Sequence, residues 1–593
     1  MENEIKQRDI PMRKYLRKYL KLLKKNKRLR TISLVALSLL LLLIVVLIIA
    51  LILKYQSSKQ LTMAINEEPI TLDPAYSSCA DFETLTACCF EGLMKFDENG
   101  NPVCAGATSY HVSDDGLVYT FNISPDSFWS NGEKVKAQDY IYAWERAAVK
   151  ERNTEYAYLF ENIEIVERPL IVEEEEETEE ENKENKEEKT EETNTDEITE
   201  EVEMVKVMNL EAKNDNVLVV HLVKPDSSFL SKCAMAVFSP VCQRIVEAET
   251  RIWGYTEDIF VSNGAYKLED WEGGSYIKFS KNEFYKKANQ KSPETIRVTF
   301  AQDEDENFTL FKRGDVLYSS CVSGEKIKKY ENKNYFNCLD DYGTYYICFN
   351  HNIKPFNDPK VREALSLAID RYEIAESIED MCVNAACSLI SPAFKDAQGN
   401  SIVNSFTNKI DVTSKSVKGN VEKARQLLAE AGYPDGEGFP EFNYCYNDNF
   451  HHEKVAEMII EMWKNNLGIT CTAKSLNFDK FISDRTHHNF DAVRAGSISP
   501  YNDVTTIFEN FMSNSNYFYW VNDNYDSIVS RMRKTNDLSQ RLTMCIEAEK
   551  YLSDEKVACP VYWYSNCYLA SKRLDNFYVL PSGVAYFDNV IIR

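Results

Sequence analysis

Sixteen cysteines and seven histidines are the residues of this 593-residue sequence best suited to redox or metal chemistry. Their spacing favours neither use. There is no CxxC, the one adjacent pair is Cys88-Cys89, and the histidines form neither HExxH nor a Cys/His cluster at zinc spacing. Many cysteines lie inside apolar runs such as YYICFN and KVACPVYWY, where a buried thiol acts as a small hydrophobe. The sequence therefore predicts mostly reduced, buried thiols and no metal site.

Motifs for covalent or phosphoryl-transfer catalysis are also missing from the sequence. There is no GxSxG nucleophile motif, no P-loop and no metal triad. Isolated acids are too numerous to indicate a catalytic carboxylate pair. We therefore expect a protein that performs no chemistry on its ligand and needs no cofactor.

A continuous apolar segment, TISLVALSLLLLLIVVLIIALIL, occupies residues 31–53 and contains no charged residue. As a helix it would extend about 35 Å, which is enough to span a bilayer. A cleaved secretory signal is the alternative, but its apolar region is only about 7 to 15 residues long and precedes a small-residue cleavage site. Here Lys54-Tyr55-Gln56 follows, and the first cysteine that could accept lipid is Cys79. We predict an uncleaved transmembrane helix.

Charge sets the expected orientation of that helix. Residues 1–30 carry twelve Lys and Arg against three acids, so the positive-inside rule keeps this end in the cytoplasm. Everything after Leu53 is then expected on the extracellular side of a single-pass cell-membrane protein.

Cysteines outside the cell usually form disulfides, which is the alternative to reduced thiols.

Residues 173–203, EEEEETEEENKENKEEKTEETNTDEITEEVE, contain eighteen acids and three lysines. Like-charge repulsion and the near absence of apolar groups predict a solvated, disordered loop. Collection of cations is the weaker alternative, because carboxylates without fixed geometry bind divalent ions weakly. Without this segment the chain is only mildly acidic, and we expect no nucleic acid as a partner.

From residue 61 onward predicted strands and helices alternate. Asp358 and Pro359 are the expected N-cap and first residue of one helix, and Gly432 and Gly468 are expected to end two others. The mixture predicts an α/β fold in which the two halves of the chain form separate lobes. The expected elements are strands 60–65, 117–123 and 470–476, and helices 137–149, 358–371, 420–436 and 452–469.

Eight segments carry a family resemblance, and they occur in the expected order from about residue 61 to the C-terminus. Together they resemble the oligopeptide-binding proteins of ABC importers, which are extracellular solute-binding proteins of family 5. The segments are EEPITLDPAYSSC, FEGLMKFDENGNPVCAGATSYHVSDDGLVYTFNI, WSNGEKVKAQDYIYAWERA, VSNGAYKLEDW, KNEFYKK, PFNDPKVREALSLAIDR, ARQLLAEAGYPDGEGFPEF and VYWYSNCYLASKRL.

The resemblance implies a two-lobed clamp of the periplasmic-binding-protein type (type II), which closes over a ligand about a hinge. It also implies an additional small domain and a first lobe built from three separate segments. The expected parts are the tail 1–30, the transmembrane helix 31–53, lobe I at 61–90, 236–338 and 568–593, the small domain at 91–235, and lobe II at 339–567.

Two extended segments would bind the main chain of a peptide, because a reader of many sequences can use backbone hydrogen bonds and roomy side-chain pockets. The resemblance places one segment after the LDP motif and the other within the motif that reads RAGW in the family. In this sequence the residues are Ser78, Cys79 and Ala80, and Gly496, Ser497 and Ile498.

Further ligand-binding positions are implied singly by the resemblance. Arg485 and Arg494 match arginines that can meet a peptide C-terminus, and a guanidinium forks well onto a carboxylate. Asn447 matches an amide that contacts ligand. The aromatic positions are Tyr156 in the small domain and Tyr562 and Tyr564 beside the site.

One stretch, RAGSISPYNDVTTIF, departs from the family pattern RAGWxADYNxPTTF. Ser497 aligns with the pocket-lining Trp, and Pro500 aligns with the Asp that pairs with the ligand's ammonium group. An unpaired charge buried there would cost several kcal/mol. Either the ligand is an N-blocked or internally held peptide, or not a peptide, or a carboxylate such as Asp503 does the same work from a shifted position.

The sequence thus predicts a membrane-anchored extracytoplasmic binding protein that captures oligopeptides by lobe closure and delivers them to the permease subunits of an ABC transporter. We expect it to be a monomer. A membrane-tethered sensor or scaffold that is no longer coupled to import is the other class of function that the sequence leaves open.

Overall fold

The computed structural model describes residues 59–149, 156–169, 204–249, 253–287, 289–301, 304–322, 333–378 and 382–593, and, before them, 15, 18, 19, 26, 28, 31, 32, 35 and 38–46. Within these parts of the chain, no helix is both long and apolar enough to cross a membrane. The predicted tail 1–30 and transmembrane span 31–53 fall only partly on described residues, and the acidic segment 173–203 lies outside them. Those three assignments stay predictions.

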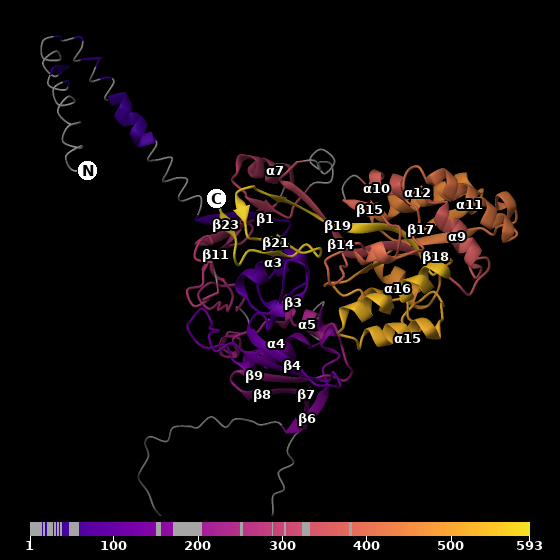
Figure 1. Cartoon of the computed structure of the whole chain (residues 1–593), viewed down its shortest axis with the longest axis horizontal. Coiled ribbons are helices and arrows are strands. Elements are labelled where there is room, and N and C mark those ends of the chain that lie inside the picture. Colours follow the sequence, from indigo (N-terminus) through magenta and orange to yellow (C-terminus); the bar gives the residue numbers. More distant parts are fainter. Residues whose placement is uncertain are drawn as a thin grey trace, which may run out of the picture.

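The predicted α/β architecture is confirmed, and one mixed sheet passes through both lobes (Figure 1). Its strand order is β10-β11-β12-β1-β13-β19-β14-β18-β16-β17, with β15 beside β19. The strands are β1 (Gln60–Ile65), β10 (Tyr266–Glu272), β11 (Tyr276–Lys281), β12 (Thr295–Phe300), β13 (Tyr318–Ser319), β14 (Phe336–Phe349), β15 (Val383–Ala385), β16 (Phe442–Asn447), β17 (Cys471–Leu476), β18 (Ala492–Ile498) and β19 (Cys559–Ala570).

Two neighbouring strands, β14 and β19, are long enough to belong to both lobes. They have 14 and 12 residues, whereas strands commonly have about 5–6. The two strands pair antiparallel along most of their length, with a register shift between Asp340 and Thr344. β13 pairs with β19 at Leu569 and Ala570, on the lobe I side of the shift, and β18 pairs with β14 from Gly343 onward. The shift is therefore the point at which one lobe gives way to the other.

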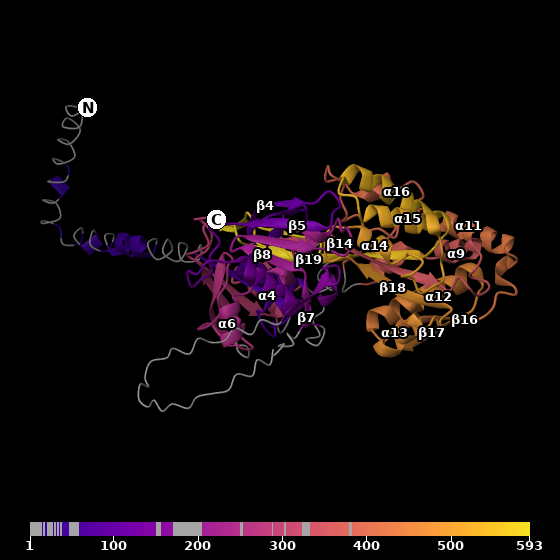
Figure 2. The same cartoon turned by 90° about the horizontal axis from the view of Figure 1, so that it is seen from below.

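In lobe II the alternation of side chains along β14 fixes which helices cover which face. Tyr345, Ile347 and Phe349 point into a core formed with α9, α11 and α12, whereas Tyr346 and Cys348 point into a second core formed with α14, α15 and α16. Figures 1 and 2 show these helix groups on opposite faces of the sheet. The helices of lobe II are α9 (Pro359–Leu367), α10 (Arg371–Ser377), α11 (Val417–Glu430), α12 (Phe450–Leu467), α13 (Phe478–Thr486), α14 (Thr505–Glu509), α15 (Asp523–Met532) and α16 (Leu538–Asp554).

The helix boundaries predicted from capping residues are confirmed in lobe II. The Asp358 carboxylate accepts a hydrogen bond from Lys360 N at 2.8 Å and caps α9, which begins at Pro359. Gly468 ends α12 in the left-handed region with φ 69°, and Gly432 follows α11 with φ 96°. Glycine is favoured at both positions because a Cβ is disfavoured there.

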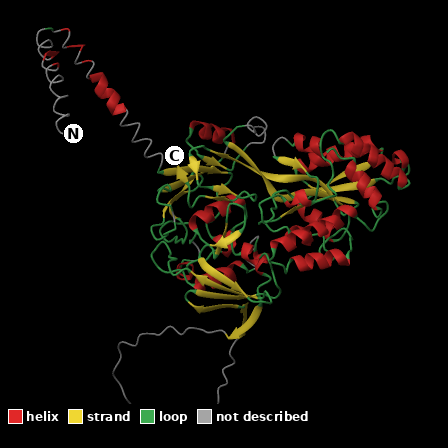
Figure 3. Cartoon of the chain, viewed as in Figure 1, coloured by secondary structure: helices red, strands yellow, loops and turns green. Residues whose placement is uncertain are grey.

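The small domain lies against lobe I and consists mainly of a four-stranded antiparallel sheet and α4 (Figure 3). Its sheet has the order β4-β5-β9-β8, and β6 and β7 form a separate two-stranded antiparallel sheet. The strands are β4 (Ala107–Val112), β5 (Val118–Ile123), β6 (Ile165–Pro169), β7 (Met204–Met208), β8 (Leu210–Asn214) and β9 (Val217–His221). The remaining helices of this half are α3 (Ala80–Cys89), α4 (Ala137–Ala147), α5 (Phe229–Lys232), α6 (Gln243–Ala248) and α7 (Glu304–Arg313).

A buried ion pair ties the LDP motif of lobe I to α4 of the small domain. Arg146 Nη1 donates to Asp73 Oδ1 at 2.9 Å, and the second oxygen of Asp73 accepts from Nη2. The Asp73 side chain is 4% exposed and also accepts from Ala75 N at 3.1 Å. Arg146 lies over the Trp253 ring, 5.8 Å from its centroid. The motif therefore joins two parts of the fold, with both charges satisfied.

Replacing Asp73 by Ala should lower the free energy of unfolding by about 3–5 kcal/mol, because it leaves a buried guanidinium unpaired. Denaturant unfolding followed by tryptophan fluorescence measures the loss. The control is Glu430→Ala, which removes the exposed pair with Lys360 and should cost at most about 1 kcal/mol. Equal losses in the two variants would contradict the role given to Asp73.

Candidate functional site

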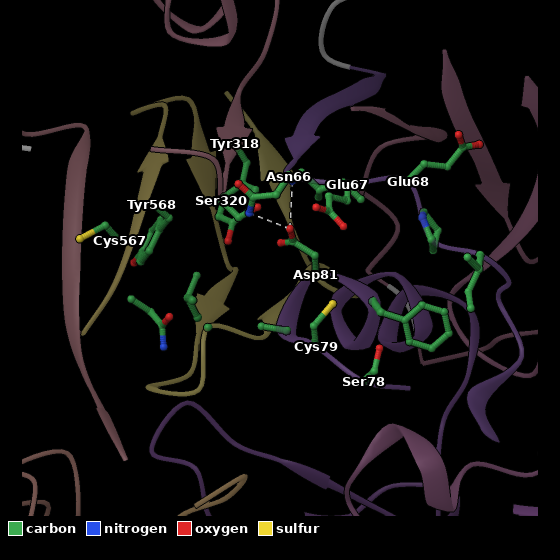
Figure 4. A pocket seen from close by; sticks show the side chains of 18 of the residues that line it. Asn66, Glu67, Glu68, Ser78, Cys79, Asp81, Tyr318, Ser320, Cys567 and Tyr568 are labelled. Carbon is green, nitrogen blue, oxygen red and sulfur yellow. Dashed lines mark hydrogen bonds between the residues drawn. The ribbon is translucent and has the colours of Figure 1, made fainter. Parts of the chain in front are cut away.

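A hollow of about 480 Å³ opens in lobe I beside the hinge (Figure 4). Its wall includes the end of β1, the start of α3 and part of β19, and the predicted binding residues Ser78, Cys79 and Ala80 line it. Cys79 has an extended backbone (φ −151°, ψ 165°) and is exposed, but Ala80 is already the first residue of α3. The extended segment therefore ends one residue earlier than predicted, because Asp81 and Glu83 favour a helix N-terminus at this point.

Among the described residues, the charged ones that line this hollow are all acids, namely Glu67, Glu68 and Asp81. Asp81 Oδ2 accepts from the backbone N and the Nδ2 of Asn66, at 3.0 and 2.9 Å. Glu68 is held by Trp271 Nε1 at 2.7 Å. Figure 4 shows Asp81 and Glu67 on the same side of the hollow, near Asn66. The lobe I wall consequently presents negative charge. The sequence analysis did not identify it, because Glu67 and Glu68 lie in the matched segment EEPITLDPAYSSC but the resemblance gave them no contact with ligand.

The second predicted segment lies on β18 in lobe II, at an edge that is only partly paired. β18 pairs with β14 along its whole length, and Ser499 N donates to Tyr342 O, so the main-chain groups of alternate residues Gly496 and Ile498 face away from β14. On that side β16 pairs with β18 only at Ala492 and Val493. In the described part of the chain, no strand lies beside Gly496–Ile498 on this edge.

Ser497 has the opposite orientation from Gly496 and Ile498. Its side chain is buried and accepts from Asn510 Nδ2 at 2.6 Å, whereas Gly496 and Ile498 are exposed. Ser497 thus stands where the resemblance implies a pocket-lining Trp, but it packs toward α14.

Arg494 and Asn447 come together at the edge between β18 and β16. Arg494 Nε donates to Asn447 Oδ1 at 2.8 Å, and the guanidinium carbon lies 5.2 Å from the centroid of the Phe481 ring. Arg485, on α13, lies 5.4 Å from the same centroid and 4.2 Å from that of Tyr517. The structure therefore gathers both predicted arginines around one aromatic ring, with the amide of Asn447 orienting one of them.

Arg485 has an unused hydrogen-bonding group. Its Nε atom is buried and has no hydrogen-bond partner among the described residues.

Nearby, burial and the charge of Arg494 lower the pKa of His452 to about 4, so this imidazole is neutral at physiological pH. The fixed positive charge of the cluster comes from the two guanidinium groups.

The two predicted tyrosines of β19 have different roles in the packing. Tyr562 is buried and stacks on Tyr345, with ring centroids 4.7 Å apart, so it belongs to the core of lobe II. Tyr564 is half-buried, and a Cβ at Gly496 would lie only 3.0 Å from its hydroxyl. Burial raises the pKa of Tyr564 to about 12, so it stays a neutral hydrogen-bonding group. Of the pair, Tyr564 is the one beside the open edge of β18.

A second hollow, of about 590 Å³, lies between the small domain and lobe II. Ile498, Pro500 and Asp503 line it from lobe II, and Tyr158 lines it from the small domain. The predicted Tyr156 does not line this hollow; it packs against the core shared by lobe I and the small domain. Tyr158, with 53% of its surface exposed, was missed because alternate tyrosines in the sequence cannot be told apart by pattern.

Asp503 is already engaged within lobe II. It is 3% exposed, forms an ion pair with Arg541 and accepts from Thr505 N at 2.9 Å. Pro500 is half-buried and carries no charge. The carboxylate nearest in sequence to the missing family acid therefore stabilises the turn before α14, and this arrangement does not favour its use as a receptor for an ammonium group.

Two lobes share one pair of strands, and a small domain packs against the first lobe. One hollow lies beside the hinge, and the other lies between the small domain and lobe II. This arrangement is that of the two-lobed solute-binding proteins. A match to bacterial extracellular solute-binding proteins, family 5 (Middle), covers residues 101–519, and the chain belongs to this family. As the sequence predicts, it is an extracytoplasmic binding protein and not an enzyme.

Relatives of known name resemble the chain over most of its length. It is 25% identical to the dipeptide-binding protein DppE of Bacillus subtilis, over 90% of this chain and 92% of the relative. It is 26% identical to the periplasmic oligopeptide-binding protein OppA of Escherichia coli, over 88% and 90% of the two chains.

Solved structures show the same fold. The murein tripeptide-binding protein MppA in its unliganded open form has a TM-score of 0.73, with 24% identity over 90% of this chain and 97% of that chain. Haemophilus influenzae OppA in complex with the peptide RPPGFSPFR has a TM-score of 0.60, with 23% identity over 90% and 99% of the two chains.

Replacing Asp503 by Asn should leave ligand affinity unchanged and lower the free energy of unfolding by about 3–5 kcal/mol, because it breaks a buried ion pair. Peptide titration calorimetry and denaturant unfolding measure the two effects. Asp554→Asn, at the exposed pair with Lys550, is the matched control. A tenfold loss of affinity for free-amine peptides, with no loss for acetylated ones, would instead make Asp503 the ammonium receptor.

Proposed function

We propose that this protein captures peptides outside the cytoplasm by closing its two lobes over them, and passes them to an ABC transporter permease. The observation that carries the proposal is the open edge of β18, where no described strand pairs with the main-chain groups of Gly496 and Ile498 that face away from β14, beside Arg494. An extended peptide can add to such an edge as a further strand. The names of the relatives, which include dipeptide- and oligopeptide-binding proteins, support a peptide as the ligand.

Closure about the β14–β19 hinge would complete the site. No described residue between 344 and 560 lines the lobe I hollow, so the predicted segment Ser78–Ala80 and the β18 edge do not share this hollow in the present conformation. Bringing them together would exclude water and strengthen charged contacts to the ligand. We propose that the parts implied by the resemblance are the bodies that move in this clamp. Lobe II, at 339–567, would move relative to lobe I and the small domain.

The distribution of charge suggests an orientation for the peptide. The arginines of lobe II would receive the C-terminal carboxylate, because guanidinium groups pair well with carboxylates. The acids of the lobe I hollow, Glu67 and Asp81 in particular, would attract the N-terminal ammonium group. They would take over the role of the family Asp, whose position is occupied here by Pro500. We infer that recognition of the ammonium group has moved from lobe II to lobe I.

Membrane attachment through residues 31–53 would keep the receptor near its permease. A tether raises the effective concentration of one partner at the other without any new contact. We propose that the protein acts as a single-pass, monomeric receptor with its N-terminus in the cytoplasm.

A receptor for N-blocked peptides or for a ligand that is not a peptide is the second candidate. The specific observation that favours it is that Pro500 stands where the family acid is expected, while both lobe II acids described at the second hollow are already paired. Asp503 forms an ion pair with Arg541, and Glu509 forms one with Arg533. This candidate keeps the same fold and the same clamp.

Arg494→Ala should weaken the binding of free-carboxylate peptides by about 30-fold or more, since truncating one partner of a buried charge pair costs about 2–5 kcal/mol. Amidation of the peptide C-terminus should have a similar effect on the wild type and little further effect on the variant. Arg531→Ala, at an exposed ion pair with Glu547, is the matched control. If Arg494→Ala binds free and amidated peptides as tightly as the wild type, the arginine does not read the carboxylate.

Native mass spectrometry of the full chain in detergent, followed by thermal shift with free and N-acetylated peptides, tests the function itself. We expect a copurified peptide and a rise in melting temperature that acetylation or the double variant Glu67→Gln/Asp81→Asn removes. Stabilisation by blocked peptides or a non-peptide metabolite alone would establish the second candidate. If nothing binds, and permease subunits do not copurify, the tethered sensor or scaffold becomes the better account.

A further inference from the structure

Three cysteines that are far apart in the sequence come together beside the hinge. Cys338 lies on β14, Cys567 lies on β19, and Cys382 directly precedes β15. The sulfur of Cys338 is 2.6 Å from that of Cys382 and 3.1 Å from that of Cys567, and all three sulfurs lie within 4.8 Å of one another. Sequence spacing could not reveal this cluster, because its members come from three separate elements.

The strand register explains why two of these thiols face each other. Cys338 and Cys567 are directly opposite in the antiparallel ladder. Ala570 N donates to Tyr335 O, and hydrogen-bonded pairs alternate with non-hydrogen-bonded ones, so Cys338 and Cys567 form a non-hydrogen-bonded pair. Side chains are closest at such pairs, where the Cα atoms are only about 4.5 Å apart.

Lobe II supplies the third thiol. β15 pairs with β19 from Val383↔Tyr564 to Ala385↔Tyr562, and this pairing places Cys382 at the end of β15 that is nearest Cys567. The cluster therefore joins both hinge strands, β14 and β19, to the segment of lobe II that precedes β15.

The surroundings of the cluster suit a soft metal ion. Cys338 is exposed, which leaves a path for entry, whereas Cys382 and Cys567 are half-buried and pack against Phe311, Phe336 and Leu569. Cys567 lies at the edge of the lobe I hollow, and Figure 4 shows its sulfur directed away from the acids there. The apolar side limits access of water, and the open side admits an ion.

We propose that Cys338, Cys382 and Cys567 bind a thiophilic metal ion of low coordination number, with Cu(I) as the best fit. Three sulfur ligands without a carboxylate or imidazole make a soft donor set, which selects Cu(I) or Zn(II) over Mg²⁺ and Ca²⁺. Structural zinc usually takes four protein ligands, and the described residues supply three. Each bound thiol gives up its proton to solvent, and the ion is neither oxidised nor reduced.

Occupancy would also affect the hinge. An ion shared by β14, β19 and the segment before β15 would restrain the strands about which the lobes move. Binding of ligand and binding of metal would then influence each other through the same hinge, which goes beyond capture of a solute.

The test uses the full chain in detergent, reduced and freed of metal, and titrated anaerobically with Cu(I) held by a chromogenic chelator. We expect one Cu(I) per chain and a rise in melting temperature. Cys338→Ser, Cys382→Ser and Cys567→Ser should each lower the affinity at least about 100-fold, since even changes behind the ligands of a metal cost about 10–100-fold. Cys104→Ser, which alters an exposed thiol on β3 (Pro102–Cys104), is the matched control and should bind as the wild type does.

A parallel arm replaces Cu(I) by Zn(II) and measures retained metal by mass spectrometry. One Zn(II) lost in the same three variants would support the same site with a water as fourth ligand. Near-UV circular dichroism of Cys338→Ser, whose side chain is exposed, checks that loss of metal is not loss of fold. Retention of neither ion, or retention that the three variants do not change, would overturn the proposal. A Cys338–Cys382 disulfide that re-forms after reduction, with no metal bound, would overturn it in favour of a redox pair.

Discussion

The antiparallel pairing of β14 with β19 is the interaction on which the rest of the structure depends. Each strand begins in the core of one lobe and ends in the core of the other, so neither lobe has a complete sheet without both strands. The register shift at Asp340–Thr344 interrupts the ladder where the lobes meet, and rotation there disturbs few hydrogen bonds. Both lobes can therefore remain rigid while their relative orientation changes, which is what a clamp requires.

Crowding at the same point limits what the hinge can tolerate. A Cβ at Gly343 would lie 2.7 Å from Ile498 Cγ1 and 2.9 Å from Tyr564 Cδ2. Burial raises the pKa of the nearby Asp341 carboxyl to about 6, and its Oδ1 atom has no hydrogen-bond partner among the described residues. The hinge thus contains a glycine, Gly343, where no side chain would fit, and an acid, Asp341, with one oxygen that lacks a hydrogen-bond partner among the described residues. Both residues lie close to the open edge of β18.

Local patterns in the sequence predicted three strands and four helices, and the resemblance of eight segments indicated the family. Asp358, Pro359 and Gly468 act at the helix ends where capping rules place them, because these rules depend on a few neighbouring residues. The fate of Asp503 could not be predicted in the same way, since its partner Arg541 is 38 residues away in the sequence. The contact among the three hinge thiols was even less predictable from the sequence, because only the pairing of β14, β15 and β19 brings them together.

Some predicted site residues lie where the resemblance implies, and others do not, because tertiary contacts decide where a side chain packs. Arg494 and Asn447 are in contact, as expected of neighbours in one site, but Tyr562 stacks in the core and Tyr156 packs away from the second hollow. A strand pattern cannot distinguish the buried tyrosine of a pair from the half-buried one when both faces of the strand are covered. The lobe I acids were overlooked for another reason. The hollow is formed by four separate stretches, around residues 65–82, 318–320, 566–568 and 579–583, so no single stretch indicates that it exists.

The pairing of β6 with β7 has a consequence for how the chain tolerates change. Pro169 is paired with Met204, so the polypeptide leaves the small domain and re-enters it at adjacent points (Figure 1). When a chain joins two adjacent points, doubling its length adds only about 0.6 kcal/mol of closure entropy. The number and identity of the residues between Pro169 and Met204 can therefore change without altering either lobe, and an experimenter could insert a fluorophore or an affinity epitope there and keep the fold.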